Sequence, residues 1–114
     1  MTPETWFSEM RDIWLNNKPD SISELLSNEL NYYEDPLGDP LTSIESVVSA
    51  WQGIKGQKFE YVDIKMLHEN DNIGIALWKS KSFDQPERSG AYYLELNDNG
   101  KCKEFRRWWH THTE

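Results

Sequence analysis

The chain has 114 residues, a net charge of −8, and 37% hydrophobic against 28% charged residues. This length predicts one domain, residues 1–114, with one hydrophobic core and no room for a second, cofactor-binding lobe. The acidic balance argues against binding to nucleic acid or to an anionic membrane surface, because both partners require a basic surface. No apolar run approaches the roughly 20 residues of a membrane-spanning helix.

Cysteine content and the N-terminal residues bear on the compartment. A single cysteine, Cys102, excludes an internal disulfide and a zinc site built from cysteines. The first residues lack the basic and apolar segments of a secretory signal. We therefore expect a cytoplasmic protein.

The aromatic content is high, with six Trp, five Tyr and four Phe residues. Each such ring can bury about 150–250 Å², and this number of rings exceeds what a core of this size absorbs. Because monomers rarely expose large apolar patches without a use for them, we expect some of these rings to line a pocket or a subunit interface.

Helical patterns begin at the N-terminus. Thr2 can cap a first helix, Pro3 suits its first position, and apolar residues recur at helical spacing until Asn16–Pro19 ends it. Ser21–Glu24 has the pattern of a capping box and predicts a short second helix.

A third helix follows an extended stretch, Glu29–Glu34, and a proline-containing loop over residues 36–40. Thr42–Glu45 forms a second capping-box pattern, which predicts the start of this helix. Gly53 predicts its end. Its apolar stripe consists of Ile44, Val47, Val48 and Trp51.

The second half changes to strand chemistry. Short turn-forming segments separate four predicted strands, which favours an antiparallel meander. Large apolar residues on both alternating faces predict a sheet that is covered by helices on one side and by a partner subunit on the other. The fold class is therefore α+β. The predicted strands are Lys58–His68, Ile73–Phe83, Ser89–Leu96 and Lys101–His110.

Two segments carry a resemblance to a known family. Residues 32–38 read Tyr-Tyr-Glu-Asp-Pro-Leu-Gly and lead into the helix that ends at Trp51, and residues 90–102 lead to Phe105 and Trp108–Trp109. This order resembles the nuclear transport factor 2-like superfamily, most of all its SnoaL-like polyketide cyclases and ketosteroid isomerases, over essentially the whole chain. The resemblance implies a cone-shaped α+β barrel, with three N-terminal helices packed in the concave face of a strongly curved, mainly antiparallel sheet and a pocket between them.

Asp35 allows two interpretations. A carboxylate before proline ordinarily accepts backbone hydrogen bonds within a turn. In an apolar pocket, desolvation would instead raise its pKa and make it a better general base. In ketosteroid isomerases the proton-shuttling aspartate occurs in a Glu-Asp-Pro-X-Gly stretch, which residues 34–38 match position for position. The resemblance therefore implies that Asp35 is the catalytic base.

The isomerases complete this site with a tyrosine on the first helix and a neutral carboxylic acid on a late strand, which together stabilise an enolate. The resemblance places Tyr92 at the position of the late acid and Trp14 near that of the tyrosine. Tyr92 can donate one hydrogen bond, whereas Trp14 has no phenol. We therefore expect proton transfer on a carbonyl compound other than the isomerases' steroid.

Aromatic residues and one arginine are the predicted ligand contacts. Trp51 and Trp109 match pocket-lining positions of the isomerases, and packing in the core or at a dimer interface is the alternative for both. Arg107 shares a strand face with Trp109 in a regular strand and could bind an anionic group there, whereas a β-bulge would turn it to solvent. The predicted ligand-binding residues are Trp14, Tyr33, Trp51, Trp78, Arg107 and Trp109.

Histidines give weaker signals. His110 and His112 would share one face of the last strand, which supplies half of a metal site but no third ligand. We predict no metal and no cofactor.

Two functions remain open. The first is a cofactor-independent isomerase, cyclase or lyase that acts on an apolar carbonyl compound with Asp35 as its base. The second is a non-catalytic module of the same fold, which binds an apolar small molecule or dimerises and in which Asp35 is structural. In either case we expect a homodimer formed through the outer face of the sheet.

Overall fold

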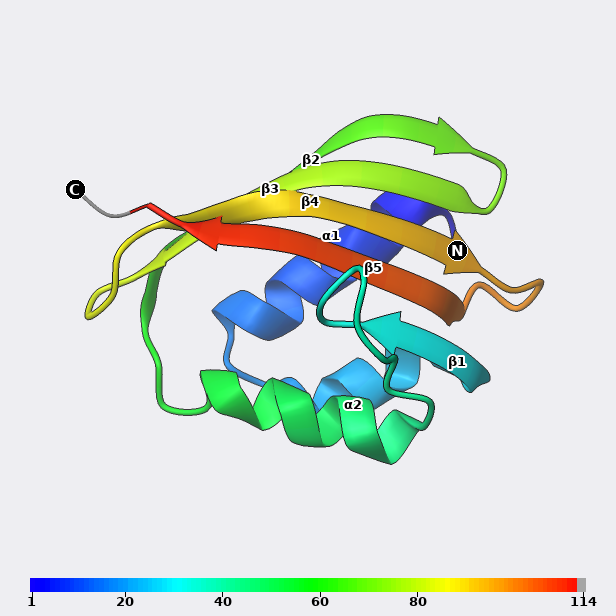
Figure 1. The fold of residues 1–114 in the computed structure, drawn as a ribbon, viewed down its shortest axis with the longest axis horizontal. Helices are drawn as coiled ribbons and strands as arrows, with labels where there is room; N and C mark the ends of the chain where they lie inside the picture. The colour runs from blue at the N-terminus through cyan, green and yellow to red at the C-terminus, as the bar shows by residue number, and fades with distance from the viewer. Residues whose placement is uncertain (113–114) are drawn as a thin grey trace.

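The computed structural model describes residues 1–112 and has an α+β fold (Figure 1). Its helices are two α-helices and two short 3-10 helices, α1 (Pro3–Leu15), η1 (Pro19–Leu25), α2 (Ile44–Trp51) and η2 (Gln52–Ile54). Its strands are β1 (Leu26–Tyr33), β2 (Phe59–Asn70), β3 (Ile73–Ser82), β4 (Arg88–Leu96) and β5 (Cys102–Thr111). Among these residues, no helix is long and apolar enough to cross a membrane.

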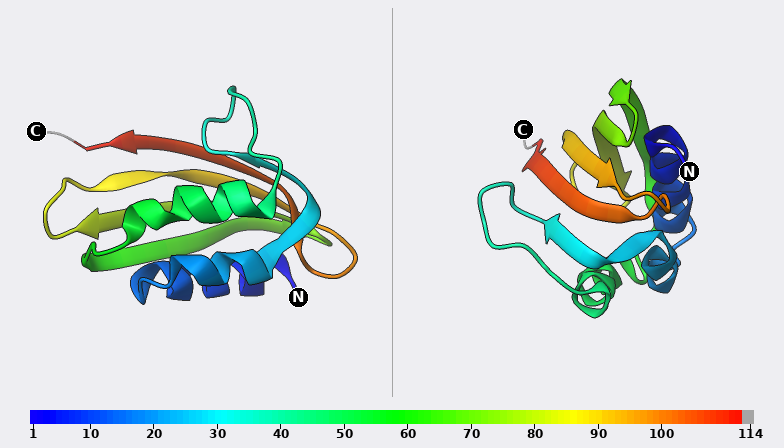
Figure 2. Two further views of the ribbon diagram at one scale, coloured as in Figure 1. Left: turned by 90° about the horizontal axis from the view of Figure 1, so that it is seen from below. Right: turned by 90° about the vertical axis from the view of Figure 1, so that its right-hand side faces the viewer.

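The five strands form one sheet in the order β1-β5-β4-β3-β2. The predicted meander is confirmed, because β2 to β5 pair with their sequence neighbours in antiparallel fashion. The extended stretch before the proline-containing loop is a fifth strand, β1, which pairs in parallel with β5. The sheet stays open, with β1 and β2 as its edges, and it curls around α1 and α2 (Figure 2).

The first helix begins as predicted, and the second does not. Thr2 caps α1, and its hydroxyl accepts a hydrogen bond from the Thr5 amide at 3.2 Å. The predicted capping box at Ser21–Glu24 is wrong, because η1 begins at Pro19 and has no side-chain cap. Asn17 has a positive φ of 55° and reverses the chain just before Pro19, whose fixed φ then begins the 3-10 turn.

The third helix begins one residue later than predicted. Ser43, and not Thr42, is its cap, and it exchanges hydrogen bonds with Ser46 in a capping box. The α-helix ends at Trp51 and tightens into η2, which contains Gly53. The turn that needs a positive φ comes later, at Gly56.

The core lies between the concave face of the sheet and the helices. Trp6, Phe7 and Met10 of α1 are fully or almost fully buried against inward residues of β3, β4 and β5. The indole of Trp6 donates a hydrogen bond to the Leu25 carbonyl at 2.9 Å and thereby holds α1 on η1. The two helices and the sheet consequently form one packed unit.

The convex face of the sheet retains exposed apolar residues. Leu77 of β3, Ala91 of β4 and Trp108 of β5 are cross-strand neighbours on this face. Leu77 and Trp108 are each 45% exposed. That a partner subunit covers this face stays a prediction.

Gly90 permits the close approach of β4 and β5. A Cβ atom at this position would overlap the backbone carbonyl of Trp108 and lie 2.8 Å from the Cα atom of Trp109. We expect Gly90→Ala to lower the free energy of unfolding by at least about 2 kcal/mol, because backbone cannot yield as a flexible side chain can. Urea denaturation measures this loss. Gly53→Ala is the control, since its Cβ meets nothing within 4 Å, and equal losses in the two variants would contradict the account.

Candidate functional site

Aromatic side chains from six elements form a closed ring on the concave face. Trp14 of α1 contacts Trp78 of β3 and Trp51 of α2, with 5.7 and 6.2 Å between ring centroids. The contact with Trp51 is edge-on, at an interplanar angle of 78°. The members of this aromatic ring are Trp14, Trp78, Tyr92, Phe105, Tyr32 and Trp51.

The sheet supplies the other half of the aromatic ring. Tyr92 stacks on Trp78 at 5.4 Å and contacts Phe105 at 4.9 Å between centroids. Phe105 stacks on Tyr32 of β1 at 4.5 Å. The Trp51 indole closes the circle by donating a hydrogen bond of 3.1 Å to the Tyr32 hydroxyl.

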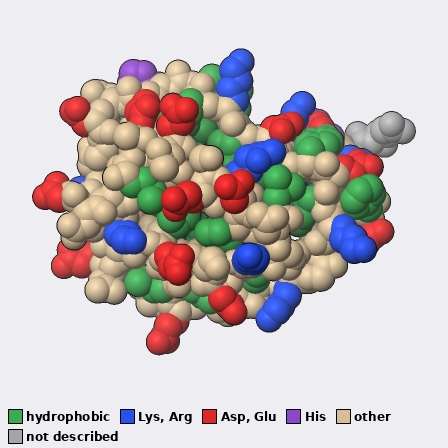
Figure 3. All heavy atoms as spheres, turned by 180° about the vertical axis from the view of Figure 1, so that it is seen from behind, with side chains coloured by type: hydrophobic (Ala, Val, Ile, Leu, Met, Phe, Trp, Pro, Cys, Tyr) green, Lys and Arg blue, Asp and Glu red, His purple; other side chains and the backbone are tan. Residues whose placement is uncertain are grey.

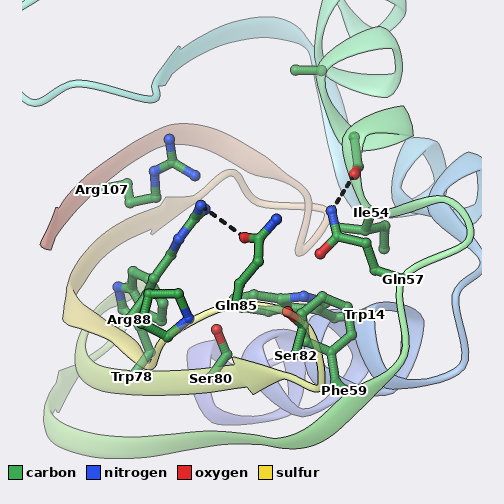
Figure 4. A pocket seen from close by; sticks show the side chains of 13 residues that line it. Trp14, Ile54, Gln57, Phe59, Trp78, Ser80, Ser82, Gln85, Arg88 and Arg107 are labelled. Carbon is green, nitrogen blue, oxygen red and sulfur yellow. Dashed lines mark hydrogen bonds between the residues drawn. The ribbon is translucent and has the colours of Figure 1, made fainter. Parts of the chain in front are cut away.

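Two adjoining hollows open beside this aromatic ring. The inner cavity has a volume of about 90 Å³ and is lined by ring members together with Glu34 and Arg107. The outer pocket, of about 250 Å³, extends toward the loop between β3 and β4 and includes Arg88 (Figure 4). Trp14 and Arg107 line both hollows, so one ligand can occupy them together.

Asp35, the predicted base, is exposed and lies in the turn after β1. Its carboxylate accepts a hydrogen bond from the Leu37 amide at 3.1 Å, and its carbonyl accepts one from the Gly38 amide at 3.1 Å. It lines neither the inner cavity nor the outer pocket. These bonds are those of the turn-forming interpretation, and the role of Asp35 as a base stays a prediction.

Glu34, the residue before Asp35, lines the inner cavity, and its backbone carbonyl accepts a hydrogen bond from Arg107. Leu30 and Tyr32 of β1 are buried, and alternation along an extended chain turns residue 34 to the same side and Asp35 away. The sequence analysis missed Glu34 because it followed the family motif. The spacing of Leu30, Tyr32 and Glu34, each two residues apart, could have predicted that Glu34 lies on the inward side.

Tyr92 places a phenol hydroxyl, a neutral hydrogen-bond donor, among the residues that line the inner cavity. It is 4% exposed, stacked against Trp78 and Phe7, and it lines the inner cavity. Burial raises the pKa of its phenol well above the ordinary value of 10. The phenol therefore stays protonated at neutral pH, and its role as a donor to a ligand stays a prediction.

Three predicted ligand-binding tryptophans border the two hollows. Trp14 lines both, Trp51 lines the inner cavity and Trp78 lines the outer pocket. The indole nitrogen of Trp14 is buried, and it has no hydrogen-bond partner among the described residues. A buried donor without an acceptor costs about 1–3 kcal/mol.

Tyr33 and Trp109 lie outside both hollows. Tyr33 is on the opposite face of β1 from Tyr32, with the Arg106 guanidinium 3.8 Å from its ring centroid. Trp109 is on the same side of β5 as Arg107 but is 48% exposed and lines neither hollow. Ligand contacts by these two residues stay predictions.

Arg107 faces inward. Its strand pairs with β4 in regular register from Glu104 to Thr111, so no bulge turns the side chain outward. Its Nε donates a hydrogen bond of 3.1 Å to the Glu34 carbonyl, which ties β5 to the end of β1.

The sequence analysis missed Arg88, which lines the outer pocket from the start of β4. Its distance from Arg107 in the chain hides this proximity from any local pattern.

Metal ligands do not gather within residues 1–112, where no group of three His, Cys, Asp or Glu side chains could hold an ion. The rings of His110 and His112 lie 4.4 Å apart. The Nε2 atom of His112 is hydrogen-bonded to the Ser89 hydroxyl at 2.6 Å. His112 is therefore hydrogen-bonded to a side chain of β4, and His110 packs against its ring.

Comparisons with known proteins show the fold. No family model matches the sequence, and no curated protein matches it. A steroid delta-isomerase from Pseudomonas aeruginosa superposes with a TM-score of 0.73 at 13% identity, over 94% of this chain and 78% of that chain. An LEH-like epoxide hydrolase of M. tuberculosis gives 0.73 at 14% identity, over 93% and 80%. An NTF-2-like protein of unknown function from Burkholderia xenovorans gives 0.77 at 9% identity, over 97% and 84%.

Proposed function

We propose that this chain, whose fold is that of the nuclear transport factor 2-like proteins, binds a small apolar ring compound in its outer pocket and inner cavity. The observation that carries the proposal is the aromatic ring beside these hollows. Flat side chains on several sides suit a flat apolar ligand, which can stack on one ring and meet the edge of another.

The sizes of the hollows limit the ligand. An apolar cavity of about 150 Å³ is large enough to bind benzene. The outer pocket, at about 250 Å³, exceeds this volume, whereas the inner cavity, at about 90 Å³, does not. We infer a ligand of one or two rings held in the outer pocket, with a substituent that reaches the inner cavity.

The groups at the inner cavity suit proton transfer without a cofactor. Glu34 supplies a carboxylate that can take a proton from a carbon next to a carbonyl group. Tyr92, whose phenol stays neutral, is a donor for the oxygen that becomes negative. We therefore propose a cofactor-independent isomerase, cyclase or lyase with Glu34 as its base. Fold neighbours that are described as an isomerase and as an epoxide hydrolase support this reaction class only in general terms.

Exchange of the α-protons of β-tetralone for solvent deuterium, followed by NMR, tests binding and chemistry together. We expect the wild-type protein to accelerate exchange and Glu34→Gln to lose at least about 100-fold of that rate, because the base is removed. Asp35→Asn is the matched control, since it changes the adjacent, exposed carboxylate. We expect it to retain the rate.

Each other outcome has a distinct meaning. Loss of exchange in Asp35→Asn alone would return the role of base to Asp35. A thermal shift by β-tetralone without any exchange would leave a non-catalytic binding domain. At about ten times its dissociation constant a ligand adds roughly 1.4 kcal/mol, so the absence of any shift would contradict the binding proposal.

A second proposal concerns the convex face, where we infer that two copies of the chain associate. Exposed Leu77 and Trp108, together with Ala91, border an apolar groove of about 630 Å³ between lysines of β2 and β3. Tryptophan is enriched in subunit interfaces, and homodimer interfaces are more apolar than the rest of a protein's surface.

Sedimentation at micromolar concentration tests this association. We expect a mass of twice the 13.5 kDa of one chain, and we expect Leu77→Lys to weaken dimerisation at least about tenfold, because it places a charge in the interface. Phe83→Lys is the control, because Phe83 is 61% exposed and lies in the loop after β3. A monomeric wild type, or equal weakening by the two variants, would overturn the proposal.

A further inference from the structure

The outer pocket is basic, and we propose that its ligand carries a carboxylate, which Arg107 and Arg88 bind while the apolar part of the ligand lies against Trp14 and Trp78. This inference rests on the proposed binding function and names the chemical class of the ligand. Figure 4 shows the two arginine side chains on one side of the pocket, with Ile54 and Gln57 on the other.

Arg107 has donors to spare. Its Nε is used by the Glu34 carbonyl. No hydrogen bond or ion pair engages its two terminal amino groups within residues 1–112. The side chain is half-buried and lines both hollows. A guanidinium with free amino groups can take a carboxylate through two parallel hydrogen bonds.

Arg88 lines the outer pocket on the same side as Arg107. Its Nη2 atom donates a hydrogen bond of 3.1 Å to the Gln85 amide oxygen. The guanidinium carbons of Arg88 and Arg107 lie 5.7 and 5.6 Å from the centroid of one indole, that of Trp109. Cation–π attraction to this shared indole therefore positions both charges at the pocket mouth. Trp109 can therefore contribute to the site by holding the two arginines, without contacting the ligand itself.

The two guanidinium charges are not neutralised by the described part of the chain. Neither Arg88 nor Arg107 forms an ion pair there with a carboxylate, and no acidic residue lines the outer pocket. The chain as a whole is acidic, with a net charge of −8, and acidic side chains are spread over the face seen from behind (Figure 3). This net charge repels anions at long range, so the attraction for an anion is local to the two arginines, which lack carboxylate partners.

Carboxylate suits this pocket better than a more highly charged group. The arginines occupy one side, while Trp14, Phe59 and Trp78 give the pocket an aromatic wall. A ring that bears a single planar carboxylate satisfies both the flat apolar wall and the planar guanidinium fork. A phosphate has the same charge sign but is tetrahedral and carries more charge. It therefore serves as a separate arm of the test.

The test compares naphthoate with naphthamide, its neutral isostere, and with naphthyl phosphate by isothermal titration calorimetry. We expect the wild-type protein to bind naphthoate at least about tenfold more tightly than naphthamide, as charge-assisted hydrogen bonds allow. Arg107→Gln is expected to abolish this preference and to keep the affinity for naphthamide. Arg106→Gln is the matched control, because Arg106 is the next residue on β5 but faces the opposite side, against Tyr33.

Arg88→Gln provides a second variant that does not depend on the bond between Arg107 and the Glu34 carbonyl, and we expect it to reduce the preference as well. Equal wild-type affinities for naphthoate and naphthamide would overturn this inference and leave the proposed binding function standing. Tighter binding of naphthyl phosphate than of naphthoate, or an equal loss in Arg106→Gln, would also overturn it. Failure of all three probes to bind would contradict the proposed function itself.

Discussion

Aromatic packing on the concave face is the constraint on which the rest of the structure depends. Trp14, Trp51 and Tyr32 come from the helices and from β1, and they meet the rings of β3, β4 and β5 beside the two hollows. Aromatic rings prefer offset or edge-on contacts, and both kinds occur here, stacked between Phe105 and Tyr32 and edge-on between Trp14 and Trp51. The same contacts that hold α1 and α2 to the sheet therefore form the walls of the inner cavity.

Two charged residues, Glu34 and Arg107, line the inner cavity beside the aromatic side chains. Glu34 directly follows β1 and lines the inner cavity, and alternation along β5 directs Arg107 to the same side as Phe105. The hydrogen bond from Arg107 to the Glu34 carbonyl joins these two strand ends. Glu34 and Arg107 thus line one cavity, and no ion pair joins their side chains.

Much of the fold followed from local patterns. The periodicity of α1, the turn-forming segments between β2 and β5, and the predicted meander are all properties of short stretches of chain. The parallel pairing of β1 with β5 joins residues about seventy positions apart, and no local pattern specifies such a pairing. The shift of the α2 cap from Thr42 to Ser43 is equally beyond sequence reasoning, because adjacent hydroxyl residues are interchangeable as caps until the backbone chooses one.

The site was harder to predict than the fold. The family motif predicted Asp35, whose carboxylate bonds to its own turn, as the base, and this role stays a prediction, whereas its neighbour Glu34 lines the inner cavity. Tyr33 followed from the same motif and lies on the opposite face. The placement of Trp14, Trp51, Trp78 and Arg107 agrees with the prediction because each belongs to a regular helix or strand whose period determines its face.

The central claim is that the hollows beside the aromatic ring hold a ligand, and the indole N–H signals of the six tryptophans can report on it residue by residue. The Trp14 indole has no hydrogen-bond partner in the part of the chain that the structure describes, whereas those of Trp6 and Trp78 are bonded to backbone carbonyls. On titration with naphthoate, followed by two-dimensional NMR, the account predicts that the Trp14 signal moves most, that the Trp51 signal also moves and that the Trp6 signal stays in place. Movement confined to Trp108, on the convex face, or no movement at Trp14 would contradict it.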